Sequence, residues 1–413
     1  MRMWRGGRPS WLFMCMFVCI LAVPGVVRAA GFALYEYSAR GNAMGGALAA
    51  TQRPDASAIA FNPATLALMS KPQAVAGVTF ITPSATVVRN GVDQKLKDQT
   101  FAVPHAYYVQ PVNEDVVLGI GEFTRFGLGT KYPYDWAGAA KMYDVLFESY
   151  SVAPTVAFRC SDALSIGVGL EVMKAGVDIW RHITFGGSDF DMHLQSEGVA
   201  IGANISALYK FNEEWAAGLV IRTPMDLYGS GSVSYSGTRA APFNAYQEGG
   251  MSMTTTLPDS YTLAVSWTPN ERFSVEAGAT FTRWEQYNNF NYDFDNNPPA
   301  DTTDWKYWRN VWRLNVGLEY WAMDWLALRA GYVWDQEPIR DGHEDYMVTA
   351  NDRQLVTGGL GFKWDDLTLD LSYQFLWARD RDNFAISEPF ATPNVSFKNN
   401  RTHLIGATVG YTF

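Results

Sequence analysis

The 413-residue sequence predicts an all-β membrane protein: a 14-stranded antiparallel transmembrane β-barrel whose lumen is plugged by an N-terminal helical hatch. Three observations predict this fold. The chain opens with a secretory leader, continues as strand-length segments joined by alternately short and long connections, and ends on an aromatic residue, Phe413, in an amphipathic strand. After the leader there is no run of eighteen apolar residues, so helical spans are not expected. A chain that crosses a bilayer without helices satisfies its backbone as a closed barrel.

Residues 1–29 have the features of a secretory signal peptide. Three arginines within the first eight residues form a basic region, residues 11–23 form an apolar region, and a small residue, Ala29, ends the segment. Cleavage after Ala29 leaves 384 residues with 28 basic and 42 acidic side chains, because the leader holds four of the 32 basic residues and none of the 42 acidic ones. The resulting net charge of −14 argues against a nucleic-acid partner.

Fourteen strand-like segments follow from Gln73 onward. Their cores are 73–87, 101–110, 116–127, 147–160, 164–182, 192–211, 215–234, 251–268, 272–289, 305–322, 325–336, 354–364, 367–379 and 401–413. The short connections are 113–115, 161–162, 212–214, 269–271, 323–324 and 365–366, and the long ones are 88–100, 128–146, 183–191, 235–250, 290–304, 337–353 and 380–400. Short turns on one rim and long loops on the other are typical of outer-membrane barrels. We therefore expect a monomeric barrel over 71–413, surrounded by the lipid of a bacterial outer membrane.

Alternation along these segments separates a lipid face from a lumen face. In 401–413 one side is largely apolar and aromatic, and the other is largely small and polar. In 311–321 and 325–334 the charged residues share the face assigned to the lumen, where Arg329 falls nearly opposite Glu319 across a short turn. This register predicts a cross-strand ion pair.

A large soluble β-protein with inward-facing aromatic residues is the alternative fold. The leader, the asymmetry of the connections and the terminal aromatic residue disfavour it. We expect Phe413 to be the contact for the barrel-assembly machinery.

Residues 30–70 differ from the rest of the chain, because they are rich in Ala and Gly and show no strand alternation. Short helical pieces with close backbone packing are expected. Asn62, Pro63 and Ala64 begin one of them, since Asn is a good N-cap and Pro suits the first helical position. A compact apolar segment before the first strand can lie in the periplasm or in the barrel, and its small apolar residues favour the barrel interior.

Three motifs in this segment resemble the amino-terminal hatch of FadL-type outer-membrane transporters, the family of long-chain fatty acid and TodX-like aromatic hydrocarbon transporters. They are Gly31–Glu36 (GFALYE), Ser38–Gly41 (SARG) and the Asn62-Pro63-Ala64 tripeptide just before the first strand. Further similarity covers 154–172, 215–224, 258–284 and 312–338.

The resemblance implies passive uptake of hydrophobic compounds, with no chemistry and no cofactor. Ligand would be captured by the extracellular loops, pass to an apolar interior pocket and leave laterally through a kink in the third strand. Long-chain fatty acids or related lipophiles are the expected ligands, and aromatic hydrocarbons are the alternative within the family. A general porin or a surface receptor is the alternative outside it, and an apolar hatch argues against the porin.

Glycine tolerates a local break in a strand ladder, and the segment aligned with the third strand of the family contains Gly119, Gly121, Gly127 and Gly129. These four are the candidate residues for the kink and lateral opening, although glycine is also common where barrel strands pack the lumen. We expect the hatch motif at 62–64 to position the hatch near this strand.

The loop 132–143 is aromatic and apolar, which is typical of a binding surface when such residues are exposed. The candidate residues for ligand capture are Tyr132, Tyr134, Trp136, Met142 and Tyr143. Packing of one loop on another is the alternative. Residues 239–248 are a candidate for the facing wall.

A carboxylate ligand calls for a cation in the pocket. The resemblance places a basic residue on the fifth strand, where this chain has Gly176, with Lys174 two residues earlier. Strict alternation puts Lys174 on the lipid face unless a bulge shifts the register. Lys174 and Arg329 are the main candidates, Arg313 and Arg181 are further ones, and a ligand without a carboxylate is the alternative.

The chain shows no pattern of an enzyme. Its five histidines have no spacing with Ser or an acid that suggests a nucleophile and base, and they form no cluster suited to a metal. The glycine-rich pieces lie in expected strands or in the hatch, so no cofactor motif is expected.

Overall fold

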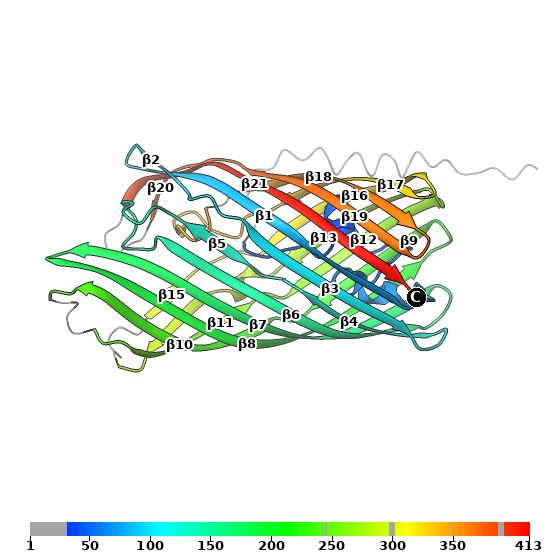
Figure 1. Ribbon diagram of the computed structural model, residues 1–413, viewed down its shortest axis with the longest axis horizontal. Coiled ribbons are helices and arrows are strands. Elements are labelled where there is room, and N and C mark those ends of the chain that lie inside the picture. The colour runs from blue at the N-terminus through cyan, green and yellow to red at the C-terminus, as the bar shows by residue number, and fades with distance from the viewer. Residues whose placement is uncertain (1–30, 242, 244–245, 297–301, 350, 387–391) are drawn as a thin grey trace, which may run out of the picture.

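In the computed structural model, the described residues are 31–413 except 242, 244–245, 297–301, 350 and 387–391. Their strands form one closed antiparallel barrel (Figure 1), because β1 pairs on one side with β3 and on the other with β21, the last strand. The predicted signal peptide and its cleavage after Ala29 lie outside the described residues. No helix in the described part has the length and hydrophobicity needed to cross a bilayer.

The strand segments are numbered in chain order. They are β1 (Gln73–Arg89), β2 (Val92–Lys95), β3 (Phe101–Pro111), β4 (Val116–Phe123), β5 (Leu128–Lys131), β6 (Asp144–Arg159), β7 (Leu164–Phe185), β8 (Ser188–Lys210), β9 (Trp215–Arg222), β10 (Met225–Thr238), β11 (Gly249–Leu257), β12 (Ser260–Asn270), β13 (Phe273–Thr282), β14 (Asn289–Phe294), β15 (Thr302–Trp305), β16 (Val311–Met323), β17 (Leu326–Asp335), β18 (Arg353–Trp364), β19 (Leu367–Ala378), β20 (Arg381–Ile386) and β21 (Thr392–Thr412).

These segments make fourteen barrel strands. The pairs β4–β5, β9–β10, β11–β12, β13–β14 and β15–β16 are each two parts of one interrupted strand. The short segments β2 and β20 pair antiparallel with the long-loop ends of β1 and β21. The predicted fold class is therefore confirmed.

Several predicted long loops are wrong in extent: 88–100 contains β2, and 290–304 contains most of β14 and β15. Residues 183–191 are mostly strand, because β7 and β8 continue to a two-residue turn at Gly186 and Gly187, which have φ of +59° and +82°. Such a glycine pair fits the tight hairpin turns whose twist matches the strands. Residues 380–400 contain β20 and the first residues of β21. Turn-forming residue types, glycine, serine, aspartate and asparagine, are frequent in these segments and hide their strand character in the sequence.

The two faces of the wall follow the predicted alternation. In β21, Ile405 and Val409 are 58% and 49% exposed on the outer face, whereas Leu404 is buried in the lumen. Glu319 of β16 lies opposite Arg329 of β17, and the Arg329 Nε atom is 2.7 Å from Glu319 Oε2. The predicted cross-strand ion pair is confirmed.

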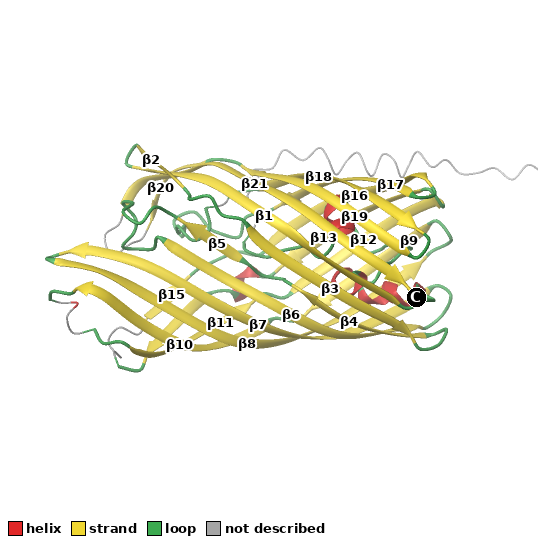
Figure 2. Cartoon of the chain, viewed as in Figure 1, coloured by secondary structure: helices red, strands yellow, loops and turns green. Residues whose placement is uncertain are grey.

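Three short helices precede the barrel: α2 (Ala39–Ala43), α3 (Ala58–Phe61) and the 3-10 helix η1 (Pro63–Leu68). A further 3-10 turn, η3 (Trp284–Gln286), interrupts the ninth barrel strand. Figure 2 shows the first three inside the barrel, towards the end where the chain terminates. They contact opposite parts of the wall, since α2 lies against β17–β19 and η1 against β6–β8. The N-terminal segment thus spans the lumen near the short-turn rim.

Candidate functional site

The third barrel strand is interrupted between β4 and β5. β4 ends at Phe123 and β5 begins at Leu128. β3 pairs with β4 only over Ala106–Pro111, and β5 pairs with β6. Among the described residues, 101–105 of β3 therefore have a strand partner on the β1 side but none on the β5 side. The wall has a local gap in its hydrogen-bond ladder here.

The segment between β4 and β5 turns into the lumen and pairs with the N-terminal segment instead. The Leu34 N–H donates to the Arg125 oxygen at 2.8 Å, the Gly127 N–H donates to the Phe32 oxygen at 3.0 Å, and Ala33 bridges Phe126. Buried backbone groups in a barrel need internal partners. Residues 32–34 therefore supply the hydrogen bonds that the broken ladder no longer provides.

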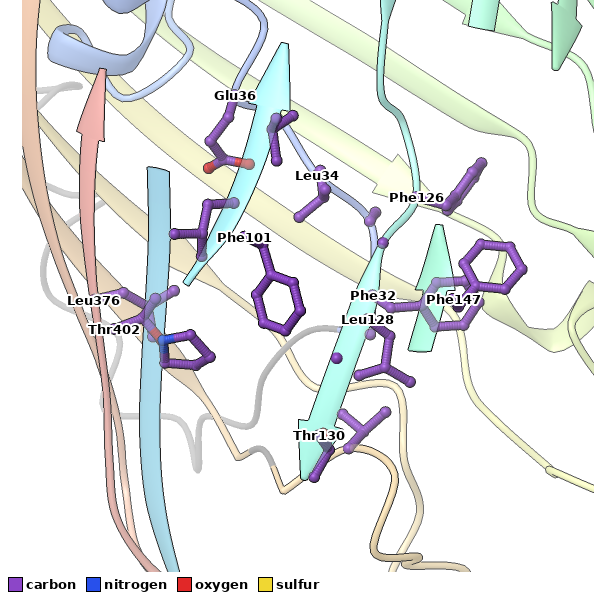
Figure 3. A pocket seen from close by; sticks show the side chains of 18 of the residues that line it. Phe32, Leu34, Glu36, Phe101, Phe126, Leu128, Thr130, Phe147, Leu376 and Thr402 are labelled. Carbon is purple, nitrogen blue, oxygen red and sulfur yellow. The ribbon is translucent and has the colours of Figure 1, made fainter. Parts of the chain in front are cut away.

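A cavity of about 210 Å³ lies beside this break. Its body is apolar and is lined by Phe32 and Leu34 of the N-terminal segment, Phe101 of β3, Leu128 of β5 and Phe147 of β6. Figure 3 shows Leu34 and Phe101 on one side of the strand that carries Leu128 and Phe32 and Phe147 on its other side, with the Glu36 carboxylate at one end.

The cavity also reaches the outer face of the wall. Its lining includes Glu148 and Tyr150 of β6, whose side chains are exposed on that face. Phe101 stands at the unpaired end of β3, and its ring lies so close to Gly129 of β5 that a Cβ there would be 2.1 Å from it. The cavity is therefore continuous with the gap between β3 and β5, which Phe101 partly fills.

The four predicted glycines lie on both sides of the break: Gly119 and Gly121 in β4, Gly127 within the break, and Gly129 in β5. A Cβ would lie 2.9 Å from Ile59 at Gly119, 2.5 Å from Tyr107 at Gly121, 2.9 Å from Leu34 at Gly127 and 2.1 Å from Phe101 at Gly129. None of the four has a positive φ. They give space to neighbouring side chains, and the bend itself is fixed by the bonds to residues 32–34.

A second, smaller cavity of about 60 Å³ lies on the other side of the N-terminal segment. Its lining is more polar and includes Arg125, Arg222 and Glu276. Arg313 lines both cavities; its guanidinium lies 4.2 Å from the centre of the Tyr35 ring and donates to the Gly45 oxygen at 3.1 Å.

Acidic groups share the first cavity with Arg313. The Glu36 carboxyl lines it, and burial raises the pKa of this carboxyl above its usual range. Asp335 also lines it but is paired with Arg353, at 2.9 Å between Nη2 and Oδ2. Arg313 forms no ion pair with a carboxylate in the described part of the chain, so it is the cation most accessible to an anionic ligand.

The two main sequence candidates for a carboxylate partner lie elsewhere. Lys174 is on the outer face, 62% exposed, with its Nζ atom 2.7 Å from Glu197 Oε2. The alternation of side chains along the strand predicted that Lys174 faces the lipid, and no bulge in β7 turns it inward. Arg329 is buried between Glu319 and Asp370, and neither Lys174 nor Arg329 lines either described cavity. Arg181 lies near the long-loop end of β7.

The Asn62-Pro63-Ala64 turn anchors the N-terminal segment. The Asn62 side chain accepts from the Ala64 N–H at 3.0 Å, which caps η1, and donates to the oxygens of Ala49 and Ala207 at 2.5 and 3.1 Å. A Cβ at Gly167 of β7 would lie 2.5 Å from the Ala64 nitrogen. The motif therefore seats the segment on β7 and β8, whereas the third strand meets it through Ile59 of α3.

Three of the five predicted capture residues are buried. The Tyr132 and Trp136 rings stack at 3.9 Å, and the Tyr132 hydroxyl donates to the Tyr346 oxygen at 3.0 Å. Met142 is buried in the same cluster. The loop 132–143 thus packs on the loop 337–353, which is the alternative that the sequence left open for these three.

The other two capture candidates face outward to a greater degree. Tyr134 is 45% exposed and its ring packs on Tyr143, which is half-buried, at 5.2 Å. Residues 239–248, the candidate facing wall, pack through Phe243 on Phe190 of β8.

Sequence reasoning missed the roles of Phe32–Leu34, Phe101 and Glu36 at this site. One signal was present in the sequence: the apolar alternation of the third strand fails over Thr124–Gly127. In the structure Thr124, Arg125 and Phe126 are buried. The residues that bond to them are some ninety positions earlier in the chain, and no local pattern indicates that pairing.

Comparison with known proteins identifies the family to which this chain belongs. Residues 20–413 match the family described as outer membrane protein transport protein (OMPP1/FadL/TodX). The chain belongs to this family. Its members are transporters of hydrophobic compounds in the bacterial outer membrane and not enzymes. The short-turn rim is therefore periplasmic and the long-loop rim extracellular.

Curated relatives and solved structures cover nearly the whole chain. Outer membrane protein P1 of Haemophilus influenzae is 25% identical over 409 residues, covering 86% of this chain and 88% of that protein. The long-chain fatty acid transport protein of Escherichia coli K12 is 21% identical over 395 residues, covering 84% and 87%. A FadL homologue of Pseudomonas aeruginosa superposes with a TM-score of 0.84 at 17% identity, covering 93% and 100%. The toluene transporter TodX of P. putida superposes with a TM-score of 0.73 at 17% identity, covering 92% and 99%.

Proposed function

We propose that this FadL-family protein takes up long-chain fatty acids or related lipophiles, which enter from the extracellular loops, occupy the 210 Å³ cavity and leave laterally between β3 and β5. The observation that carries the proposal is the continuity of the cavity with the gap in the wall, because both luminal Phe147 and outward Tyr150 line it. The segment 30–70 acts as the hatch that blocks a direct path to the periplasm.

Lateral release fits the energetics of an apolar ligand. Each buried methylene gains roughly 0.8 kcal/mol relative to water. A ligand that crossed an aqueous pore would lose that gain, whereas a ligand that moves from an apolar cavity into the bilayer keeps it. The two half-exposed tyrosines, Tyr134 and Tyr143, are the proposed first contact on the extracellular side.

The position of Arg313 favours a ligand with an anionic head group. It lines the cavity and has no carboxylate partner in the described residues, so a ligand carboxylate can take that position. The Arg313→Leu substitution is then expected to reduce uptake of oleate and to leave uptake of toluene unchanged.

The size of the cavity favours a second candidate, a single-ring aromatic hydrocarbon. An apolar protein cavity of about 150 Å³ binds benzene, and this cavity is about 210 Å³. An eighteen-carbon chain has three times the carbon atoms of benzene, so only part of it fits inside. The rest of such a chain would extend through the gap into lipid.

Filling the gap tests the proposed route. Gly129→Leu places a side chain against Phe101 within the cavity, and we expect it to lower uptake of labelled oleate and of toluene by intact cells. Gly358→Leu is the matched control, because a Cβ at Gly358 on the outer face of β18 meets only a backbone oxygen at 3.6 Å. Unchanged uptake in Gly129→Leu, with the side chain confirmed in place, would count against lateral release.

A further inference from the structure

Glu122 places a carboxyl group on the lipid-facing surface of the barrel wall. In β4 the outward residues are Leu118 and Ile120, which are 47% and 50% exposed, and Glu122 is the next in the alternation. Its direct cross-strand neighbours are Ala106 of β3 and Val152 of β6. An acidic side chain therefore follows an apolar row and lies between apolar neighbours.

Its depth places it well inside the bilayer. Glu122 lies six residues beyond Val116, the first residue of β4 at the periplasmic rim. With a rise of about 3.3 Å per residue and a tilt of about 45°, this is roughly 14 Å above the rim, near the middle of an apolar band about 25 Å tall. An ionisable group at that depth is costly and marks a functional site by default.

Among the residues that the structure describes, no hydrogen bond or ion pair explains the Glu122 carboxyl structurally. Its Oε1 atom is buried without a hydrogen bond, and no ion pair to Glu122 is found in the described part of the chain. Two other outward acids have partners: Asp226 accepts from the Thr256 hydroxyl at 2.7 Å, and Glu197 pairs with Lys174.

Glu122 stands at the periplasmic edge of the gap between β3 and β5. It is the last outward residue of β4 before the break, and Thr124, two residues later, lines the cavity. Tyr150, the next outward residue beyond Val152 on β6, lines the cavity as well. The titratable side chains that share its outer face are Tyr108 on β3 and Tyr150 and Glu148 on β6.

We infer that Glu122 is an exit group that hydrogen-bonds the polar head of the ligand as the ligand passes from the cavity into the bilayer. The inference rests on the proposed lateral release and adds the chemical class: an amphiphile with a neutral hydrogen-bonding head, such as a protonated carboxylic acid or an alcohol. Two ionised carboxylates would repel each other strongly in an apolar surrounding. The head therefore meets Glu122 with at least one proton between the two groups, whereas a pure hydrocarbon gains nothing there.

Uptake by the variants Glu122→Gln and Glu122→Leu tests this role, with Asp226→Leu as the matched outward-facing control. Loss of one hydrogen bond to the head predicts that Glu122→Leu lowers uptake of labelled oleate and of oleyl alcohol by roughly five- to tenfold. Glu122→Gln keeps a donor and an acceptor and should remain near wild type. Uptake of toluene should be unchanged in all three variants, and Asp226→Leu should match wild type for every substrate.

The outcomes distinguish the role of Glu122 as an exit group from a role in barrel stability and from the proposed lateral release. Glu122→Leu removes an unpaired carboxyl from the apolar band, so its urea unfolding should show no loss of stability. Wild-type uptake of oleate in Glu122→Leu, or an equal loss for toluene, would overturn the inference. If Gly129→Leu blocks uptake while Glu122→Leu does not, lateral release stands and the exit group alone is refuted.

Discussion

Replacing Glu319 with glutamine should release the hatch from the barrel wall. The Glu319 carboxylate is buried and binds Arg40 of α2 through two atoms, at 3.0 and 3.2 Å, and Arg329 of β17 at 2.7 Å. Removing one member of a buried ion pair costs about 3 to 5 kcal/mol. Arg40 keeps Asp55 at 3.1 Å and Arg329 keeps Asp370 at 2.6 Å, so we expect the lower end of that range, about 3 kcal/mol.

At about 1.4 kcal/mol per factor of ten, that loss shifts the docking equilibrium of α2 roughly a hundredfold. Amide hydrogen exchange of residues 39–43 should accelerate by that factor, while exchange in the barrel strands stays as in wild type. The control is Asp324→Asn, which removes an acid from the exposed pair with Arg272 and should change little. Equal protection of α2 in Glu319→Gln and Asp324→Asn would refute the role of Glu319 in holding α2 against the wall.

Three further substitutions test the gap and the docking of the hatch. Phe101→Ala removes the ring that partly fills the gap, so uptake of both oleate and toluene should rise by a fewfold in intact cells; a fall would show that the ring guides ligand. Burial raises the pKa of Glu36, so its protonated form favours docking of residues 32–34, and docking is strongest below pH 4.5 and weakens as pH rises through the raised pKa. Glu36→Gln should abolish this pH dependence in hydrogen exchange of those amides, and a persistent dependence would assign it to another group. Gly167→Val places a Cβ atom 2.5 Å from the Ala64 nitrogen and should reduce hatch protection without unfolding the barrel, measured by limited proteolysis.

The barrel was predictable from the sequence because its rules are local. Alternation fixes which side chain faces lipid, and it placed Arg329 opposite Glu319 and Lys174 on the outer face. Local rules failed at the hairpin between β7 and β8. The Gly-Gly-Ser-Asp stretch 186–189 is typical of a loop, whereas Gly186 and Gly187 have the φ values of a tight hairpin turn.

For the site, the sequence predicted which strand is involved but not which residues form it. Glycine density indicated the third strand, but the break at 124–127 depends on hydrogen bonds to residues 32–34, a tertiary pairing that no local pattern encodes. The loop aromatics show the same limit. Tyr132 and Tyr134 are two positions apart in one aromatic loop, yet the first is buried against Tyr346 and the second is exposed. Composition cannot tell a packed aromatic residue from a displayed one.

Residues 32–34 connect the cavity to the gap, and this has a mechanical consequence. The same short segment lines the cavity with Phe32 and Leu34 and completes the hydrogen bonds of the inward-turned strand. The Phe32 ring also packs edge-on against Trp284, at 4.9 Å between ring centres. Displacing the segment would enlarge the cavity and at the same time free the backbone of 124–127. Because those groups would then lack partners in an apolar surrounding, the gap cannot widen independently of the N-terminal segment.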